Sequence, residues 1–421
     1  MPSRAGPAET GRPQSRPDGS GGYRAVFRVR EFRFVFAAHV LSLLGTVVAH
    51  VALPVLVYAE TASPLLSALT FACGFLPQAM GGALLAPVAE RSEGRRVLVG
   101  CDLVCAVCVA AMLVPGMPLA GLLALRAVAA FVQPLFGGVR AAGLGEILKG
   151  DAFVLGRSLI RISAQAAQIA GFAATGLLLL AVTPRTALLL TVVGFLASAL
   201  LLGVGTRARP PLAVARARGG TRALFADRRV RGLLALCWLP PAFVVVPEGL
   251  AAPYAAETGA GPAGVGLLLA AMPVGAVTAE LAAGGLLRPA ARERLVLPLA
   301  GCLLLPFLLF ASRPELPLAL ATLFVAGSGF AYTLGLDRWF FDAVPEELRA
   351  RAMTVMSAGL MTAQGMGMAV GGLAAEFMPP HWAVVGAGVV GTCCVLAAVR
   401  AVRRTGPRTG RPNPETPLVT M

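Results

Sequence analysis

The chain has 421 residues, of which 57% are hydrophobic and only 14% are charged. A water-soluble protein of this length would carry a far more charged surface, so the composition excludes a soluble domain and indicates a protein dissolved in lipid. The net charge of +15 does not indicate a nucleic-acid partner. Nearly all Lys and Arg residues fall in the tails and in alternate loops between apolar segments, which is the pattern of multi-span membrane proteins.

The first 30 residues are rich in Gly, Pro, Ser and Arg, and we expect them to form a disordered N-terminal tail. Apolar segments long enough to cross about 30 Å of hydrocarbon follow. Twelve spans are predicted, at residues 34–58, 65–88, 97–115, 118–138, 162–182, 186–204, 232–256, 263–287, 295–311, 317–341, 352–376 and 381–402. An even number of spans places both termini on the basic side of the membrane, which is the cytoplasmic side.

The longest polar break is rich in arginine and divides the chain into two halves of six spans each. We therefore expect an N-terminal bundle (31–204), a basic cytoplasmic linker (205–231), a C-terminal bundle (232–402) and a cytoplasmic tail (403–421). The predicted fold class is an all-α membrane protein with twelve transmembrane helices in two pseudo-symmetric six-helix bundles.

The two halves share a repeated pattern of residues. In each half, the pattern lies at the start of an apolar segment that follows a basic loop. The same number of residues separates the two members of each matched pair. The pattern consists of Arg157, Ser163, Ala164 and Gly171, which recur as Arg351, Ser357, Ala358 and Gly365. Duplicated halves of this kind are typical of secondary transporters.

The loop after the second span, residues 89–98, reads Ala-Glu-Arg-Ser-Glu-Gly-Arg-Arg-Val-Leu. It resembles the loop signature of the major facilitator superfamily, with Glu90 in place of the usual Asp. Residues 43–45, 52–58, 61–64, 101–103 and 344–351 are similar to the branch that contains macrolide-efflux and siderophore-exporter proteins. The resemblance covers about residues 31–402, although the fifth-span signature of the antiporters survives only as Gly171-Phe172 and Gly176.

This resemblance implies a gate at the cytoplasmic side, where a carboxylate at a helix end pairs with loop arginines and helix dipoles as the two halves move. Asp102, Asp337 and Arg338 lie near the cytoplasmic ends of their spans and resemble gate charges more than substrate ligands. The expected gate residues are Glu90, Arg91, Arg95, Arg96, Asp102, Asp337 and Arg338.

An ionisable residue inside a span is costly and usually faces a water-filled cavity or a partner, and three such residues are the main candidates for the transport pathway. These residues are His50, Arg126 and Glu248. Each is predicted to lie at a depth of roughly 12 Å from the outer end of its span, at a rise of about 1.5 Å per residue. We expect Glu248 to pair with Arg126 when the outer side is closed, and protonation of Glu248 to weaken the pair. His50 is either a second proton site or a core residue bonded to a helix carbonyl.

Two polar stripes at helical spacing are further candidates. Ser42, Thr46 and His50 share one face of the first span, and Gln165 and Gln168 share one face of the fifth. Either stripe lines the transport pathway or joins helices by hydrogen bonds. In the tenth span, Tyr332 is a weaker candidate for the cavity.

The sequence contains no phosphate-binding loop, no nucleophile motif and no metal-ligand spacing, so we expect neither an enzyme nor a bound metal or cofactor. The leading hypothesis is a proton-coupled antiporter that exports drug-like or secondary-metabolite molecules by alternating access, as in multidrug resistance. The alternatives are an importer or facilitator of another small organic solute, and a non-transporting membrane sensor. The expected partners are a small-molecule substrate, protons and the lipid bilayer, for a monomer in the inner or plasma membrane.

Overall fold

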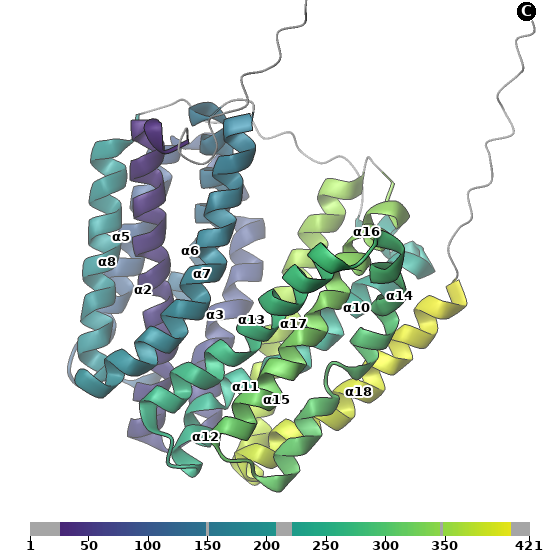
Figure 1. Cartoon of the computed structure of the whole chain (residues 1–421). Coiled ribbons are helices and arrows are strands. Elements are labelled where there is room, and N and C mark those ends of the chain that lie inside the picture. The colour runs from purple at the N-terminus through teal and green to yellow at the C-terminus, as the bar shows by residue number, and fades with distance from the viewer. Residues whose placement is uncertain (1–25, 149–150, 208–220, 346–347, 406–421) are drawn as a thin grey trace, which may run out of the picture.

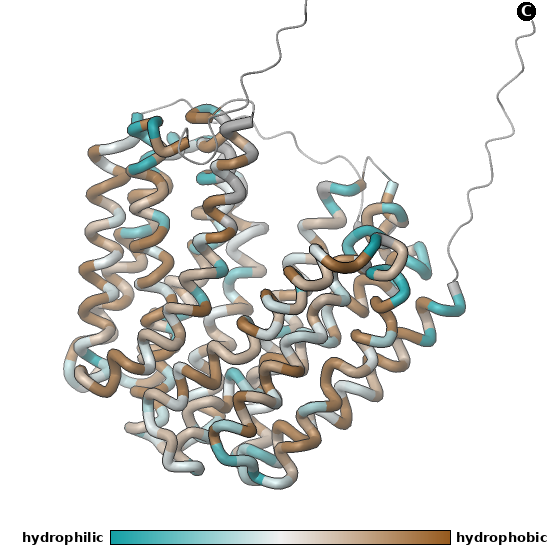
Figure 2. Tube along the Cα trace, in the orientation of Figure 1, coloured by the Kyte–Doolittle hydropathy of each residue, from teal (hydrophilic) through white to brown (hydrophobic). Residues whose placement is uncertain are grey.

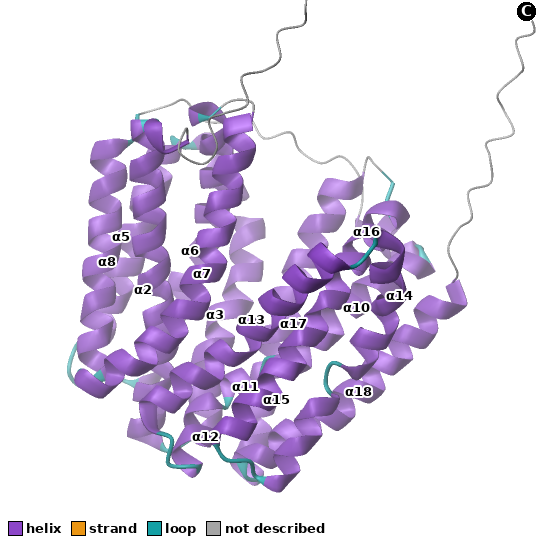
Figure 3. Ribbon diagram, in the orientation of Figure 1, coloured by secondary structure: helices purple, strands orange, loops and turns teal. Residues whose placement is uncertain are grey.

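The structure is a computed structural model, and it describes residues 26–148, 151–207, 221–345 and 348–405 (Figure 1). Residues 1–25 and 406–421 of the expected tails and residues 208–220 of the expected linker lie outside the described set. The regular structure of the described residues is entirely helical (Figure 3).

The helices of the N-terminal half cross back and forth along the chain. Their bounds are α2 (Arg30–Thr61), α3 (Pro64–Leu84), α4 (Ala86–Arg91), α5 (Gly94–Met112), α6 (Leu119–Ile147), α7 (Asp151–Ala181) and α8 (Pro184–Gly205). Serine and threonine N-caps followed by proline at the first helical position set two of the boundaries. Ser63 accepts from the backbone N–H of Leu66 at the start of α3, and Thr183 accepts from that of Thr186 at the start of α8.

The C-terminal half is more broken. Its helices are α9 (Thr221–Ala226), α10 (Arg228–Val244), α11 (Val246–Gly249), α12 (Ala251–Glu257), α13 (Gly261–Leu286), α14 (Pro289–Cys302), the 3-10 helix η1 (Leu305–Ser312), α15 (Leu316–Ser328), the 3-10 helix η2 (Gly329–Tyr332), α16 (Thr333–Ala343), α17 (Arg349–Phe377) and α18 (Pro380–Thr405). The seventh crossing is interrupted at Val245 and at Leu250. Proline removes a backbone donor and clashes with the preceding turn, and the first interruption lies between Pro241 in α10 and Pro247 in α11.

The described helices group into twelve crossings, so the predicted twelve-helix fold is confirmed. Ten helical segments of the described residues are long and apolar enough to span a membrane. The other two crossings are α5 and α17. The first carries Arg95, Arg96 and Asp102, and the second is rich in glycine, alanine and methionine because it packs at the interface between the halves. Hydrophilic residues concentrate at the ends of the bundles (Figure 2).

Packed structure begins slightly before the first predicted span. Val26 is fully buried in a small apolar cluster with Phe32, Leu144 and Leu148. The described chain therefore joins the N-terminal bundle from residue 26 onward, within the segment that composition alone assigned to the tail.

The halves meet at one end of the molecule. We call the end where α8 finishes and α10 begins the linker end, and the opposite end, where α3 and α13 begin, the far end (Figure 1). Two helix pairs, α3 with α17 and α7 with α13, join the halves. Near the far end these contacts are intimate: a methyl group added at Gly176 would lie 2.8 Å from the Cα of Gly266, and one added at Gly372 would lie 2.5 Å from the Cβ of Ala68.

Toward the linker end the same four helices carry exposed apolar side chains. Met80 and Leu84 of α3 are 60% and 62% exposed, and Leu281 and Leu286 of α13 are 71% and 84% exposed. Figure 1 shows the helices of the two halves together at the far end and diverging toward the linker end. The structure is therefore closed at the far end and parted at the linker end.

Candidate functional site

Arg126 lies in the second turn of α6, close to the far end, and is only 4% exposed. Its guanidinium is packed against Gly74 of α3, where a side chain would collide with it. Among the described residues, no hydrogen-bond partner reaches its buried Nη2. A buried cation without a partner is costly in lipid and marks a functional position.

Beside this guanidinium lies a cavity of about 20 Å³, which Thr46 and Gln133 also line. That volume is enough for roughly one water molecule. Gln133 in turn accepts a hydrogen bond from Gln78 of α3 at 2.9 Å. The head of Arg126 thus faces the inside of the N-terminal bundle, where the nearby polar groups are uncharged amides and hydroxyls.

His50 of α2 is within electrostatic reach of Arg126, as the sequence predicts for a shared depth. Its ring stacks on Phe71 with a centroid separation of 6.4 Å. The imidazole makes no hydrogen bond to any described residue, so the alternative of a ring held by a helix carbonyl finds no support. His50 lies deep in the protein but keeps some accessible surface, so its nitrogens are available to water or a solute.

Glu248 lies in α11, the short helix between the two breaks of the seventh crossing. Its carboxylate neither pairs with a cation nor accepts a hydrogen bond from any described residue, although the side chain keeps some accessible surface. The adjacent Gly249 packs against the other half, since a methyl group there would lie 3.5 Å from the Cβ of Ala68. Glu248 therefore lies next to a residue of the closed contact between the halves.

The expected pair between Glu248 and Arg126 is not formed, although the far end is closed. The reason is the position of α3 between them. Arg126 packs on α3 at Gly74, whereas α11 packs on α3 at Ala68, which lies on another face of the same helix. Equal depth in the membrane places two residues on one level, but it does not place them on facing sides of their helices.

The remaining pathway candidates lie apart from these three. Gln165 and Gln168 are exposed on the part of α7 toward the linker end. Tyr332 is 1% exposed in the core of the C-terminal bundle, and its hydroxyl donates to the carbonyl oxygen of Leu236 at 3.1 Å. This carbonyl lacks its helical donor because residue 240 is proline. The hydroxyl of Tyr332 therefore supplies the hydrogen bond that this carbonyl oxygen would otherwise lack, and its proton is not available to a substrate.

The predicted gate loop lies at the linker end, which is parted. Glu90 is near the end of α4, and its side chain is outside the described set. Arg91 is exposed, Arg95 donates to the carbonyl oxygen of Gly203 at the end of α8, and Arg96 pairs with Glu93 at 3.1 Å. These contacts all lie within the N-terminal half.

In the other half, the two expected gate charges are also near the linker end. Asp337 is exposed, and Arg338 pairs with Glu293 of α14 at 3.0 Å and approaches Asp342 at 4.0 Å. The described contacts of Arg338 thus hold α16 to α14 within the C-terminal bundle.

Asp102, another expected gate residue, makes its described contacts inside the N-terminal bundle. It is fully buried in the N-terminal bundle, where its two carboxylate oxygens accept from the hydroxyls of Ser42 at 3.0 Å and Ser198 at 2.6 Å. The side chain of Arg140 lies within electrostatic reach and itself contacts the Nδ1 atom of His39 at 2.5 Å. This cluster joins α2, α5, α6 and α8.

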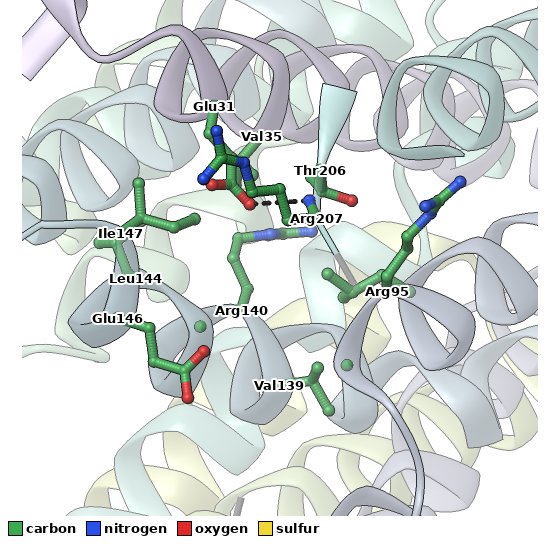
Figure 4. Close-up of a pocket in the computed structure, with 13 residues that line it drawn as sticks. Glu31, Val35, Arg95, Val139, Arg140, Leu144, Glu146, Ile147, Thr206 and Arg207 are labelled. Carbon is green, nitrogen blue, oxygen red and sulfur yellow. Dashed lines mark hydrogen bonds between the residues drawn. The ribbon is translucent and has the colours of Figure 1, made fainter. Parts of the chain in front are cut away.

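Two residues that complete this cluster, His39 and Arg140, were not predicted from the sequence. Both were visible as ionisable residues at the edges of apolar segments, and only the packing of four helices shows that they meet. Figure 4 shows Arg140 again in a neighbouring pocket of about 50 Å³, where it extends toward Glu31 and Arg207. The backbone N–H of Arg207 donates to the carboxylate of Glu31 at 3.0 Å, which ties the start of the linker to α2.

Two polar clusters at the far end were also not expected. Glu376, at the end of α17, accepts from the backbone N–H of Leu65 at 3.0 Å and from the hydroxyl of Ser63. Within the C-terminal half, Glu257 binds Arg313 at 2.5 Å and His381 at 3.2 Å. The first cluster joins the two halves, and the second holds α12 to the start of α18 and to the loop at Arg313.

An apolar groove of about 510 Å³ runs between α17 and α18 over α10. Its lining residues are all apolar and include Phe243, Val246, Met366 and Val390. Met366 is 57% exposed, and it is one of the methionines that make α17 unusual in composition. No group of three or more His, Cys, Asp or Glu residues in the described chain is arranged to hold a metal ion.

Comparisons with known proteins agree with this architecture. A sequence model of the Major Facilitator Superfamily matches residues 242–420. No curated protein matches the chain. The nucleoside transporter NupG is 12% identical with a TM-score of 0.72, covering 89% of this chain and 98% of that one. The peptide transporter POT, solved with sulfate, is 13% identical with a TM-score of 0.70, covering 92% and 99%. At such identities the likeness establishes the fold.

Proposed function

We propose that this chain is a member of the major facilitator superfamily and a secondary transporter of small organic solutes that works by alternating access. The observation that carries the proposal is the packing of the halves, which touch through glycine-lined contacts at the far end and part at the linker end. A duplicated fold with one closed and one open end is suited to a two-state exchange between opposite openings. The arginine-rich linker end is the cytoplasmic side.

Glu248 is the proton-coupling residue of this proposal. It lies next to the closed contact between the halves, and no described residue neutralises it. An ionised carboxylate without a partner in such surroundings is costly, whereas a protonated one is tolerated. Protonation therefore favours the state with the far end closed, and ionisation favours the state in which water reaches Glu248 through an open far end.

Arg126 and His50 serve as a separate polar element in the N-terminal half. Because α3 separates Arg126 from Glu248, the coupling does not run through a direct pair between them. His50 faces accessible space beside the guanidinium, so it is the second candidate for a proton or for a polar group of the solute. Gln165 and Gln168 line the wall toward the open linker end.

Export of drug-like or secondary-metabolite molecules is the proposed direction and substrate class, on the strength of the loop at residues 89–98 and the first-span resemblance. The alternative is transport of a more polar solute, which the structural neighbours favour because they are nucleoside and peptide transporters. Both classes suit a cavity with a few polar groups among apolar walls.

The test is transport into proteoliposomes with an imposed pH gradient, using a panel of lipophilic dyes, macrolides, nucleosides and dipeptides. Wild type is compared with Glu248→Gln, and with Glu315→Gln as a matched control, because Glu315 is exposed at the far end and its side chain makes no capping bond. Gradient-driven uptake that is lost in Glu248→Gln and kept in the control supports the proposal. Equal uptake in all three overturns the role of Glu248, and no uptake of any solute with wild type overturns the transporter.

A further inference from the structure

Glu376 connects the two halves at the far end, because it belongs to α17 but binds the start of α3. It lies in the last turn of α17, in the C-terminal half. Its carboxylate accepts from the backbone N–H of Leu65 at 3.0 Å and from the hydroxyl of Ser63, both at the start of α3 in the N-terminal half. The contact therefore spans the boundary that alternating access must open.

The physical chemistry of helix ends makes this contact favourable. The first N–H groups of a helix have no partner within the helix, and that end carries a partial positive charge. Ser63 satisfies one such group, the N–H of Leu66, at 3.2 Å, while Glu376 satisfies the N–H of Leu65. Bonds of this kind to an ionised acceptor are roughly twice as strong as neutral ones.

In its own helix, the same carboxylate is badly placed. The C-terminal end of α17 carries a partial negative charge, which disfavours an acidic side chain there. Glu376 gains its stabilisation only from α3, and only while the far end is closed. A purely local role would require a donor within α17, and each hydrogen bond that the structure shows for this carboxylate goes to α3.

The contact sits at the rim of the closed seam. Immediately below it, Gly372 of α17 meets Ala68 of α3, and further along the pair Gly365 meets the side chain of Leu76. This seam is apolar and tightly packed, whereas the hydrogen bonds of Glu376 are exposed at its edge. Opening the far end must break the exposed bonds first, before the seam can separate.

We propose that Glu376 is a gating residue, which holds the far end closed by capping the first turn of α3 from the other half. The inference rests on the proposed alternating-access function. It adds a residue whose loss shifts the balance between the two openings without touching the solute or the proton-coupling site.

The test is hydrogen–deuterium exchange of the full chain in lipid nanodiscs, read at both ends of the molecule. In Glu376→Ala, we expect the far-end segments 58–70 and 370–380 to open about tenfold more often, which corresponds to about 1.4 kcal/mol. The linker-end segments 80–96 and 349–360 should exchange more slowly, because the linker end closes when the far end opens. Ser63→Ala should shift both ends in the same directions but less, and Glu315→Ala should shift neither.

Faster exchange confined to residues 63–66, with an unchanged linker end, would show a helix cap without a gating role and would overturn the proposal. No change anywhere would do the same. Size-exclusion elution as a single peak checks that each variant is folded, and Glu376→Gln supplies a variant that keeps an acceptor oxygen without the charge. The opposite shifts at the two ends can appear even if no panel solute is transported, so failure of this inference and failure of the transporter are told apart.

Discussion

The contact between Gly176 of α7 and Gly266 of α13 gives the most quantitative prediction. A methyl group added at Gly176 would lie 2.8 Å from the Cα of Gly266 and 3.0 Å from the carbonyl oxygen of Ala263. Carbon atoms in contact prefer about 3.5–4.0 Å, so in Gly176→Ala the two helices must separate by roughly 1 Å. Overpacking of this kind costs about 1–3 kcal/mol.

That penalty falls only on the state in which the halves touch at the far end. At about 1.4 kcal/mol for each factor of ten, Gly176→Ala should shift the equilibrium toward the far-end-open state by about five- to a hundredfold. Hydrogen exchange measures it through segments 171–181 and 261–270, which should exchange faster in the variant. The linker-end segments should exchange more slowly.

Two matched glycine variants separate gating from simple damage. In Gly171→Ala, the methyl group would lie 2.8 Å from a side-chain carbon of Val47, which belongs to the same half. That variant should lower the melting temperature without moving the balance between the two ends. Gly203 has open space around its Cα, so Gly203→Ala should change neither property. If Gly176→Ala behaves like Gly171→Ala, the glycine contact is structural and our reasoning about it is wrong.

Three further substitutions test the interior contacts. Asp102→Ala removes the acceptor of the Ser42 hydroxyl, whereas the Ser198 hydroxyl still reaches the carbonyl oxygen of Ala38 at 3.0 Å, so unfolding should become easier by about 1–3 kcal/mol. Asp102→Asn should cost much less, and equal losses in a denaturant titration would argue against a charged role. Tyr332→Phe should lower stability by about 0.5–1.5 kcal/mol and leave transport unchanged, whereas a loss of transport in a stable variant would place Tyr332 in the pathway. Glu257→Gln should lower the melting temperature by only a few degrees, since Arg313 is 58% exposed and water screens the pair; a collapse of folding would contradict that estimate.

The fold could be predicted from the sequence because each crossing is a long apolar run bounded by charged or glycine- and proline-rich turns. The alternation of arginine-rich and arginine-poor loops predicted that successive crossings run in opposite directions. The repeat of Arg157 and Gly171 as Arg351 and Gly365 indicated the duplication. The boundary between the N-terminal tail and the bundle was harder to predict, because Val26 lies in a segment of polar composition and yet packs into an apolar cluster of the bundle.

The candidate site was only partly predictable, because a sequence gives depth along a helix more readily than direction around it. His50 and Arg126 come together as expected. Glu248 shares their predicted depth but is separated from them by α3. Other contacts form only when helices far apart in the sequence pack together. The buried cluster around Asp102 and the contact of Glu376 with α3 are of this kind, and no local sequence pattern predicts them.

The seventh crossing differs from its counterpart in the first half in a way that has a mechanical consequence. The first crossing is one continuous helix, Arg30–Thr61, whereas the seventh consists of three helices separated by interruptions at Val245 and Leu250. A continuous helix behaves as a stiff rod, and a jointed one bends at its breaks under a small load. The two halves are thus alike in topology but differ in this crossing, which in the C-terminal half has two points at which it can bend.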